Sequence, residues 1–277
     1  MNGKLYIVST PIGNLEDITL RAVNILNNSD IIACEDTRTT KKLLNHLQIK
    51  NTLMSFHEHN EKSASAKIIN SLKEGMNVSL VSDSGTPLIS DPGYNLIQSC
   101  IENAIDIVPV PGPCAVITAL TASGLSANEF LFLGFIPRSS KKITELFTNI
   151  KEFPYTVIAY ESPKRILKSL GIINEFMGNR KIVLARELTK LHEEFLRGTI
   201  SDVIKELESR TSIRGEITVL FEGIRNTGTT QDSVDVTLRK LKDEGKTLRE
   251  SVHISATLLN SSKSKIYKRA LKIWDKN

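Results

Sequence analysis

The feature that most constrains the fold is an alternation of short apolar runs with longer segments of helical periodicity, over the first 112 residues. "KLYIVST" (4–10) is a continuous apolar run of strand length, whereas "DITLRAVNILNN" (17–28) places Ile18, Ala22 and Ile25 at helical spacing. Such alternation is typical of an α/β domain with a mostly parallel five-stranded sheet and helices on its faces. Strands are expected at 4–10, 30–36, 51–56, 78–82 and 105–112, and helices at 17–28, 39–47, 63–75 and 93–104.

A second α/β domain is expected to follow, with a mixed sheet. Segments 181–187 and 193–199 leave no room for a helix between them, so these two strands should be antiparallel. The polar stretch "GIRNTGTTQDS" (223–233) is typical of a linker. We predict an N-terminal α/β domain over 1–115, a second one over 116–226 and a helical appendage over 232–277. The further strands are expected at 130–137, 155–161, 181–187, 193–199 and 216–222, and the helices at 114–124, 140–152, 163–177 and 201–210.

The C-terminal segment is predicted to be helical, and it carries the net charge. Helices are expected at about 234–244, 247–259 and 260–274, the second opening with "TLRE" (247–250), which has the form of a capping box. Residues 232–277 hold 11 Lys and Arg against 6 Asp and Glu, which leaves 36 − 11 = 25 against 31 − 6 = 25 elsewhere. A basic helix-turn-helix-like appendage indicates a nucleic-acid partner. A solvated tail with Lys-rich faces explains the charge equally well.

The length and composition indicate a globular protein of more than one domain. A chain of 277 residues is too long for one small core. No apolar stretch reaches the ~18 to 20 residues that cross a bilayer and no leader-like segment is present, so we expect no membrane association. Cys34, Cys100 and Cys114 are far apart and odd in number, which indicates reduced thiols in a cytoplasm.

Turn-rich loops follow the five expected strands of the first domain, at the sheet edge where open α/β folds bind ligands. No G-x-G-x-x-G or Walker-type sequence is present, so a dinucleotide bound in the standard way is not expected. Ordinary turn chemistry explains any single loop, but three Gly- and Pro-containing loops at one edge favour a bound ligand. In the loop at 82–93, we expect Asp91 to cap the next helix and Pro92 to begin it.

A series of sequence blocks resembles one enzyme family. The blocks are "LYIVSTPIGNLEDIT", "EDTRTT", "HEHNE", "SLVSDSGTPLISDPGY", "VPVPGPCAVITALTASGL", "AYESPKR", "LARELTK" and "GEITVLFEG", in this order. From Leu5 to Gly223 they are similar to the ribosomal small-subunit RNA (cytidine-2′-O)-methyltransferases, of the tetrapyrrole-methylase-like class of S-adenosylmethionine enzymes. The tail resembles that family's C-terminal helical domain more loosely.

The resemblance implies a fold, an activity and partners. The fold would be two α/β domains with the methyl donor, S-adenosylmethionine, in the cleft between them, and the chain would form a homodimer. The activity would be 2′-O-methylation of a decoding-centre cytidine in 16S RNA of the small ribosomal subunit, in the cytoplasm and without a metal.

The resemblance also implies which residues bind the donor. The turn at 83–87 would wrap its amino-acid and ribose portions through backbone groups of Ser84, Gly85 and Thr86. Asp83 would lie beside the donor, where a carboxylate attracts the cationic sulfonium. The predicted donor-binding residues are Pro11, Gly13, Asp83, Ser84, Gly85, Thr86, Pro87, Pro111, Gly112, Pro113, Ala115, Tyr160, Glu161, Arg186 and Glu187.

Methyl transfer to a ribose hydroxyl needs a positioned nucleophile and benefits from a group that takes the hydroxyl proton. The candidates for that catalytic group are Glu35, Asp36, His57, Glu58 and Lys190. The predicted RNA contacts are Arg38, Arg165, Lys263, Lys265, Lys268 and Arg269. An ion-pair cluster that caps the following helix would also explain Glu35, Asp36 and Arg38. For His57, a simple surface-loop role is as consistent with the sequence as a catalytic role. For Arg165, a role in holding the domain interface is as consistent as a contact with the substrate.

Two other functions stay open at the level of the sequence. One is a methylase of the same fold that acts on a tetrapyrrole or another small molecule, which the neutral body allows. The other is a non-catalytic RNA-binding protein that has kept the fold.

Overall fold

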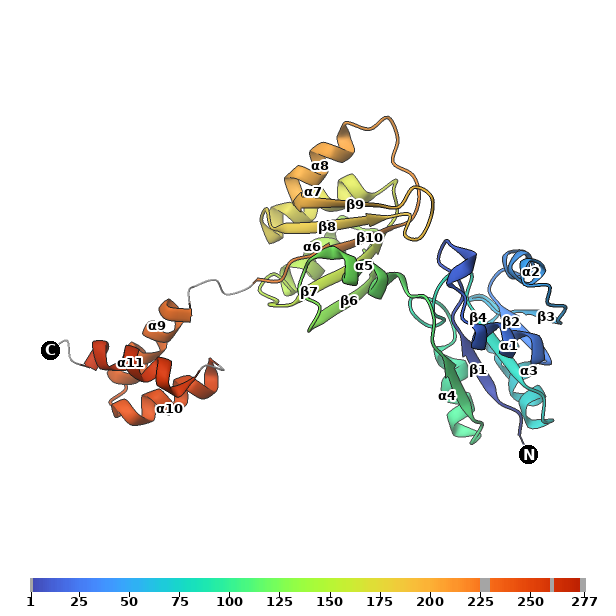
Figure 1. Cartoon of the computed structure of the whole chain (residues 1–277), viewed down its shortest axis with the longest axis horizontal. Coiled ribbons are helices and arrows are strands. Elements are labelled where there is room, and N and C mark those ends of the chain that lie inside the picture. The colour runs from blue at the N-terminus through green and yellow to red at the C-terminus, as the bar shows by residue number, and fades with distance from the viewer. Residues whose placement is uncertain (1, 225–229, 260–261, 275–277) are drawn as a thin grey trace. The chain divides into compact units, whose positions relative to one another are not determined.

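Figure 1 shows the computed structural model of the chain, which describes residues 2–224, 230–259 and 262–274. The chain forms two compact units, Met1–Gly223 and Ile224–Asn277. Each of the ten predicted strands is present and lies inside its predicted range, so the fold class expected from the alternation is confirmed. The predicted linker at 223–233 falls partly on residues 225–229, which lie outside the described residues.

The first sheet is parallel throughout, with the strand order β3-β2-β4-β1-β5. Its strands are short apolar runs buried on both faces, which explains why they do not alternate with polar residues. Helices α1 (Leu20–Asn28) and α2 (Thr37–His46) pack on one face, and α3 (Glu61–Lys73) and α4 (Tyr94–Glu102) on the other. The strands are β1 (Leu5–Val8), β2 (Ile31–Cys34), β3 (Leu53–Ser55), β4 (Val78–Val81) and β5 (Ile107–Val110), and the short helix η1 (Leu15–Asp17) follows β1.

The second sheet is mixed, with the strand order β6-β7-β10-β8-β9. Strand β6 is parallel to β7, and the other neighbours are antiparallel, including the predicted β8–β9 pair. Helices α6 (Ser140–Asn149), α7 (Ile166–Met177) and α8 (Ile200–Glu208) cover one face and α5 (Ala115–Ser123) covers the other. The strands are β6 (Phe130–Phe135), β7 (Thr156–Glu161), β8 (Lys181–Arg186), β9 (Glu194–Thr199) and β10 (Ile217–Phe221), of which β10 is central although it comes last in the chain.

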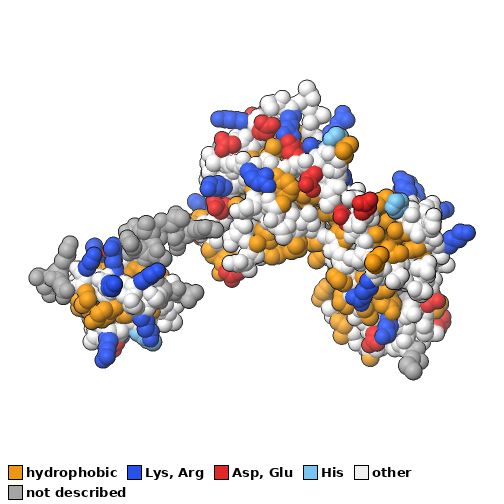
Figure 2. All heavy atoms as spheres, in the orientation of Figure 1, with side chains coloured by type: hydrophobic (Ala, Val, Ile, Leu, Met, Phe, Trp, Pro, Cys, Tyr) orange, Lys and Arg blue, Asp and Glu red, His pale blue; other side chains and the backbone are white. Residues whose placement is uncertain are grey.

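The C-terminal unit consists of three helices, α9 (Thr230–Asp243), α10 (Leu248–Leu258) and α11 (Lys263–Trp274), around a small core that includes Leu238, Val252 and Ile266. The predicted capping box is confirmed, because Thr247 Oγ1 accepts from the Glu250 N–H and Glu250 Oε2 accepts from the Thr247 N–H. Residues 260–261, which were expected to open the third helix, lie outside the described residues. Figure 2 shows Lys and Arg side chains on the surface of this unit.

The cap predicted for α4 is wrong. The helix begins at Tyr94, and its N-cap is Gly93, which has a φ of 133° and no side chain to accept a hydrogen bond. Instead Glu61, at the start of α3, accepts from the backbone N–H groups of Gly93 (3.2 Å) and Asn95 (3.3 Å). Since a carboxylate from a neighbouring helix satisfies these N–H groups, Asp91 takes no part in capping α4.

Among the helices within residues 2–224, 230–259 and 262–274, none combines the length and the apolar character needed to cross a membrane.

A carboxylate-lined candidate active site

The loops that follow β1, β4 and β5 are joined by hydrogen bonds into one floor. Thr10 and Gly85 pair through two backbone bonds, from the Thr10 N–H to the Gly85 oxygen (2.8 Å) and from the Gly85 N–H to the Thr10 oxygen (3.0 Å). Thr86 Oγ1 lies 3.0 Å from Ser9 Oγ and donates to the Pro113 oxygen at 3.0 Å. Three of the turn-rich loops are thus held together at one edge of the first sheet, as the sequence predicts.

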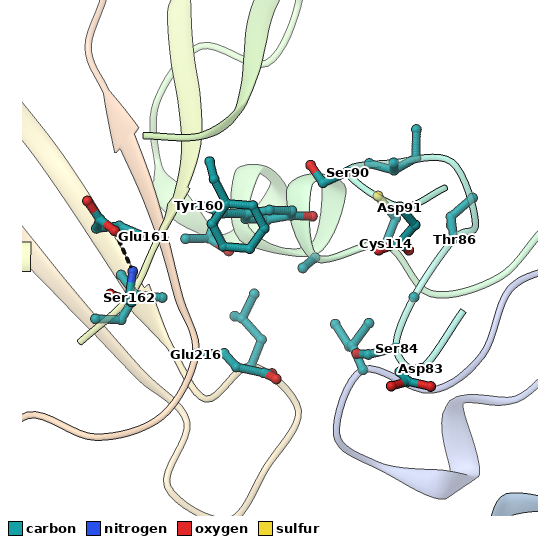
Figure 3. Close-up of a pocket in the computed structure, with 18 of the residues that line it drawn as sticks. Asp83, Ser84, Thr86, Ser90, Asp91, Cys114, Tyr160, Glu161, Ser162 and Glu216 are labelled. Atoms are coloured by element: carbon teal, nitrogen blue, oxygen red, sulfur yellow. Dashed lines mark hydrogen bonds between the residues drawn. The ribbon is translucent and has the colours of Figure 1, made fainter. Parts of the chain in front are cut away.

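A cavity of about 360 Å³ opens on this floor, and loops from both sheets line it. This volume is in the range of small-molecule sites. Figure 3 shows Tyr160 and Glu216 of the second sheet opposite Asp83, Ser84 and Asp91 of the first. The lining residues are Ile12, Glu35, Asp83, Ser84, Gly85, Thr86, Ile89, Ser90, Asp91, Cys114, Ala115, Phe135, Tyr160, Glu161, Ser162, Pro163, Leu188, Gly215, Glu216, Ile217 and Thr218.

The charged lining of this cavity is acidic. Five of the described lining residues are Asp or Glu, and none of them is Lys, Arg or His. Burial raises the pKa of Asp83 and also that of Glu35, where the neighbouring Asp83 charge adds to the effect. Burial, followed by the charge of Glu35, raises the pKa of Asp91 to about 6. Glu161 and Glu216 are paired with Arg165 and Lys190, which leaves Glu35, Asp83 and Asp91 as the lining carboxylates to favour a cationic ligand. Such a ligand would lower these three pKa values again.

One wall of the cavity is aromatic. The ring of Tyr160, on β7, packs edge to face against Phe132 (5.0 Å between centroids) and Phe135 (5.3 Å). Both Tyr160 and Phe135 line the cavity, and burial raises the pKa of the Tyr160 hydroxyl. The cavity therefore combines a flat apolar surface with negative charge, which suits a ligand that has both a planar ring and a positive group.

The structure brings seven of the predicted donor-binding residues into this cavity. They are Asp83, Ser84, Gly85, Thr86, Ala115, Tyr160 and Glu161. The predicted contact through the Gly85 backbone needs correction, since its N–H and its oxygen are already bonded to Thr10. Arg186 and Glu187 line a separate cavity beside Arg210. The remaining six, none of which lines either cavity, are Pro11, Gly13, Pro87, Pro111, Gly112 and Pro113.

Two of these glycines let loops approach one another closely. A Cβ at Gly13 would lie 2.5 Å from Lys190 Cγ, in the loop after β8, and one at Gly112 would lie 2.8 Å from Ser9 Cβ. The Asn14 N–H, beside Gly13, donates to Thr189 Oγ1 at 3.0 Å. These residues shape the walls around the cavity rather than its inner surface.

Glu161 is part of a buried network behind the cavity wall. Its carboxylate is 0% exposed, pairs with Arg165 and accepts hydrogen bonds from the Ser162 N–H and the Ser169 hydroxyl. Arg165 also donates to the Ile136 oxygen at 3.2 Å. All of these partners of Arg165 belong to the second α/β domain, so its contacts support neither the predicted RNA contact nor the alternative role at the domain interface, and they indicate a structural role within that domain.

Of the five predicted catalytic residues, Glu35 is the one that the described cavity lining includes. Asp36 is the N-cap of α2, accepting from the Arg38 N–H at 2.8 Å, and it pairs with the Arg38 guanidinium. The hydrogen bond from the Arg38 side chain is the main cause that lowers the pKa of Asp36 to about 2. For Asp36 and Arg38, the capping cluster considered from the sequence is confirmed.

The other candidates lie outside the cavity lining. Lys190 pairs with Glu187 (2.8 Å) and with Glu216 (3.1 Å). Burial alone would lower the pKa of Lys190, but the hydrogen bonds with these two carboxylates raise it, which argues against a proton acceptor. His57 Nδ1 is buried and has no hydrogen-bond partner among the described residues, and Glu58 is exposed.

The predicted RNA contacts of the C-terminal unit divide into two kinds. Lys263, Lys265 and Lys268 are exposed on α11. Arg269 instead joins α11 to α9 through two bonds to the Asp235 carboxylate, at 2.6 and 3.0 Å. Three lysines thus remain available to solvent, while Arg269 contributes to the packing of the unit.

Several lining residues were not predicted from the sequence, among them Phe135 and Cys114 and two groups that carry carboxylates. Ser90 and Asp91 follow β4 closely enough to be found by the same rule as Asp83, but Asp91 had been assigned to a helix cap. Glu216 immediately precedes β10, and Thr218 is the second residue of this strand. The first residue, Ile217, pairs with Glu161 at the end of the antiparallel neighbour β7. A search confined to the carboxyl ends of strands overlooks Glu216 and Thr218. In the described part of the chain, no three His, Cys, Asp or Glu side chains are grouped as ligands for a metal.

The chain is similar to known proteins along most of its length. Residues 4–204 match the family model described as Tetrapyrrole (Corrin/Porphyrin) Methylases. Proteins named "Ribosomal RNA small subunit methyltransferase I" are 50% identical in Hydrogenobaculum sp. (79% of this chain, 95% of the relative) and 47% identical in Thermotoga maritima (80% and 99%). A protein of the same name from Buchnera aphidicola subsp. Schizaphis graminum is 43% identical over 99% of this chain and 98% of its own length.

Solved structures of more distant proteins share the fold. The cobalamin biosynthetic enzyme cobalt precorrin-4 methyltransferase matches with a TM-score of 0.59 at 17% identity, over 79% of this chain and 94% of that one. Uroporphyrin-III C-methyltransferase from Thermus thermophilus, complexed with S-adenosyl homocysteine, matches with a TM-score of 0.56 at 14% identity, over 79% of this chain and 97% of that one. The fold, the family model and the close relatives agree: the chain belongs to the tetrapyrrole methylase family and, within it, groups with the relatives named ribosomal RNA small subunit methyltransferase I.

Proposed function

We propose that this protein transfers a methyl group from S-adenosylmethionine to the 2′-oxygen of a cytidine ribose in 16S RNA, at the decoding centre of the small ribosomal subunit. The observation that carries the proposal is the 43% identity to a named small-subunit RNA methyltransferase over 99% of this chain and 98% of the relative. The cytidine, the 2′-oxygen and the decoding centre come from the resemblance of the sequence blocks.

The lining of the cavity supports S-adenosylmethionine as the donor. When bound, this donor supplies an electrophilic methyl group on a positively charged sulfur. Asp83 and Glu35 would provide the negative charge that such a cation needs, and Tyr160 with Phe135 the flat wall for its ring. The Thr10–Gly85 bridge holds the floor in place, so little of it has to be ordered when the ligand binds.

Catalysis would depend mainly on holding the ribose hydroxyl in line with the methyl carbon. Glu35 would contribute negative charge beside the reacting groups. Burial and the Asp83 charge raise the pKa of Glu35, and the nearby His57 acts in the opposite direction, which would help to keep the carboxylate ionised. Asp36, Glu58 and Lys190 would act from outside the cavity, as supports for the loops that form it. Of these three, Lys190 holds Glu187 and Glu216 of the second sheet.

The C-terminal unit would assist RNA binding through Lys263, Lys265 and Lys268. The relative from Thermotoga maritima, which carries the same name, is covered over 99% of its length by only 80% of this chain. The C-terminal unit, 277 − 223 = 54 residues, is about as large as the part without a counterpart. We infer that residues 1–223 hold the catalytic apparatus and that the basic unit adds phosphate contacts.

A small-molecule methylase of the same fold is the main alternative. The solved tetrapyrrole methylases support it only through the fold, at 14 to 17% identity. To decide, the purified protein is given labelled S-adenosylmethionine with small ribosomal subunits from cells that lack the gene, and in parallel with porphyrinoid precursors. Label in a ribose of the 16S RNA, located by fragment mapping, supports the proposal. Label in the porphyrinoid alone overturns it.

A homodimer in the cytoplasm completes the proposal, and both rest on the resemblance alone. Light scattering coupled to size exclusion measures the mass of the particle against the 30.8 kDa of one chain. A mass of one chain at micromolar concentration contradicts the dimer.

A further inference from the structure

Asp91 does not cap the helix that follows it, and its side chain instead forms a hydrogen bond with Ser82. It follows β4 in a position where a carboxylate would ordinarily cap the next helix, but Glu61 accepts the hydrogen bonds of that helix start. Asp91 instead lines the cavity, on the wall opposite Tyr160 (Figure 3). A half-buried acid that lines a ligand cavity and takes no part in capping the next helix is explained best by a role toward the ligand.

The backbone before Asp91 is held in an unfavourable conformation that aims this segment into the cavity. Leu88 and Ser90 have φ values of 72° and 73°, in the left-handed region that side chains with a Cβ rarely adopt. The Leu88 side chain packs against the core between the first sheet and α4, where a Cβ on Gly93 would lie 3.4 Å from its Cγ. This anchor turns Ile89, Ser90 and Asp91 toward the cavity, and the three of them line it in sequence.

The groups around Asp91 leave it both charged at neutral pH and ready to take a proton. The other titratable groups that line the cavity are Glu35 after β2, Asp83 after β4, Cys114 before α5, Tyr160 and Glu161 on β7, and Glu216 before β10. Burial and then Glu35 raise the pKa of Asp91 to about 6, while a hydrogen bond with Ser82 holds it back from rising further. No lysine, arginine or histidine is among the described residues that line the cavity, so no fixed cation there neutralises the carboxylate.

We propose that Asp91 is the proton acceptor of methyl transfer, an assignment that rests on the proposed function. The ribose hydroxyl oxygen forms the new bond to the methyl carbon with a lone pair. Its proton moves to an Oδ of Asp91, and the electron pair of the broken carbon–sulfur bond stays on sulfur. Because this carboxylate binds a proton more tightly than an ordinary Asp does, the proton transfer to it is more favourable in free energy. The group is nevertheless ionised at neutral pH before the reaction.

The test compares Asp91→Asn with Glu35→Gln as the matched control, since both replace a lining carboxylate by its amide in the full-length protein. Three quantities are measured: the single-turnover rate on small ribosomal subunits from pH 5 to 9, the affinity for S-adenosylhomocysteine by calorimetry, and the melting temperature. A fourth, ¹³C NMR of labelled Asp carboxyls in the ligand-free protein, follows the titration of Asp91 directly.

We expect the wild-type single-turnover rate to fall about tenfold per pH unit on the acidic side. This fall should begin below pH 6, because the bound donor cation lowers the pKa of Asp91 from its value of about 6 in the ligand-free protein. Asp91→Asn should lower the rate at pH 7.5 by about 10² to 10⁴ and lose this acidic limb, while the affinity for S-adenosylhomocysteine changes less than threefold. Glu35→Gln should keep the limb and shift it to lower pH, because it removes a charge that favours protonation of Asp91. The ¹³C titration of Asp91 should have its midpoint near pH 6.

Three results would overturn the assignment. They are a rate of Asp91→Asn within threefold of wild type, a loss of S-adenosylhomocysteine affinity that accounts for the loss of rate, and a ¹³C midpoint below pH 5. If the wild type itself does not methylate small subunits, the proposed function has failed and the assignment fails with it. If the wild type is active and Asp91→Asn is too, only the assignment fails.

Discussion

Glu61 performs the capping role that the local sequence would give to Asp91. Asp91, just ahead of Pro92 and Gly93, has the sequence context of a helix cap, while Glu61 is an unremarkable acid in the first turn of α3. In the structure Glu61 caps α4 and Asp91 faces the cavity. The capping residue and Asp91 are 30 positions apart in the sequence. The residues around Asp91 therefore could not have predicted that Glu61 caps α4.

The raised pKa of Asp91 makes stability depend on pH in a defined direction. The folded protein binds the proton of this carboxyl more tightly than the unfolded chain does, with a pKa of about 6 against an ordinary value of 3.8. Well below pH 3.8 the group is neutral in both states and has no effect. As the pH rises through 4 to 6 the unfolded state loses its proton first, so this group lowers the free energy of unfolding, and the loss persists above pH 6.

Asp91→Asn removes this penalty. We expect the variant to be more stable than wild type at pH 8, by roughly 1 kcal/mol after allowing for solvent screening, and to show no such gain at pH 4. Denaturant unfolding at the two pH values, followed by circular dichroism, measures the difference. A variant less stable than wild type at pH 8 would mean that the carboxylate is stabilised in the fold and that its pKa is not raised.

At the scale of elements, the alternation of apolar runs with helical periodicity was sufficient to predict the ten strands. The short segment between β8 and β9 was sufficient to predict their antiparallel pairing. Both features depend on short-range sequence. The same is true of the three loops that meet after β1, β4 and β5, since parallel strands bring their carboxyl ends to one edge. The contribution of β10 could not be predicted in this way. Its first residues reach the cavity only because the strand is antiparallel to β7 and central in the sheet.

The start of α4 depends on a residue of α3, and this can be tested. Glu61→Ala leaves the Gly93 and Asn95 N–H groups without their acceptor, so we expect a loss of about 1 kcal/mol in the free energy of unfolding. Glu102→Ala is the matched control, because Glu102 is an exposed acid in the last turn of α4, where a negative charge is not favoured.

Since the one Trp of the chain, Trp274, belongs to the C-terminal unit, circular dichroism and not Trp fluorescence should follow this transition. Equal stabilities for the two Glu→Ala variants would contradict a capping role for Glu61.

At the scale of the whole molecule, the candidate active-site cavity and the basic helices belong to different compact units. We expect deletion of residues 224–277 to leave the affinity for S-adenosylhomocysteine within twofold of the full-length value. Binding to small ribosomal subunits should weaken and become less dependent on salt. For three phosphate contacts, the slope of log Kd against log salt should fall by about 2.

The matched variant is the full-length protein with Lys263, Lys265 and Lys268 changed to Gln, which keeps the unit and removes its exposed charge on α11. It should reproduce the smaller salt slope. If the deletion changes the slope and the triple variant does not, other residues of the unit carry the contacts. If neither changes it, the unit does not bind phosphates.

The central place of β10 also bears on how the protein is made. A chain that emerges from the ribosome starting at its N-terminus can complete the first sheet once residue 110 is free, whereas the second sheet stays open between β7 and β8 until residue 221 has been synthesised. The nascent protein therefore passes through a long interval in which one half is folded while the other exposes two unpaired strand edges, and the ability to bind a ligand arrives only at the end of it.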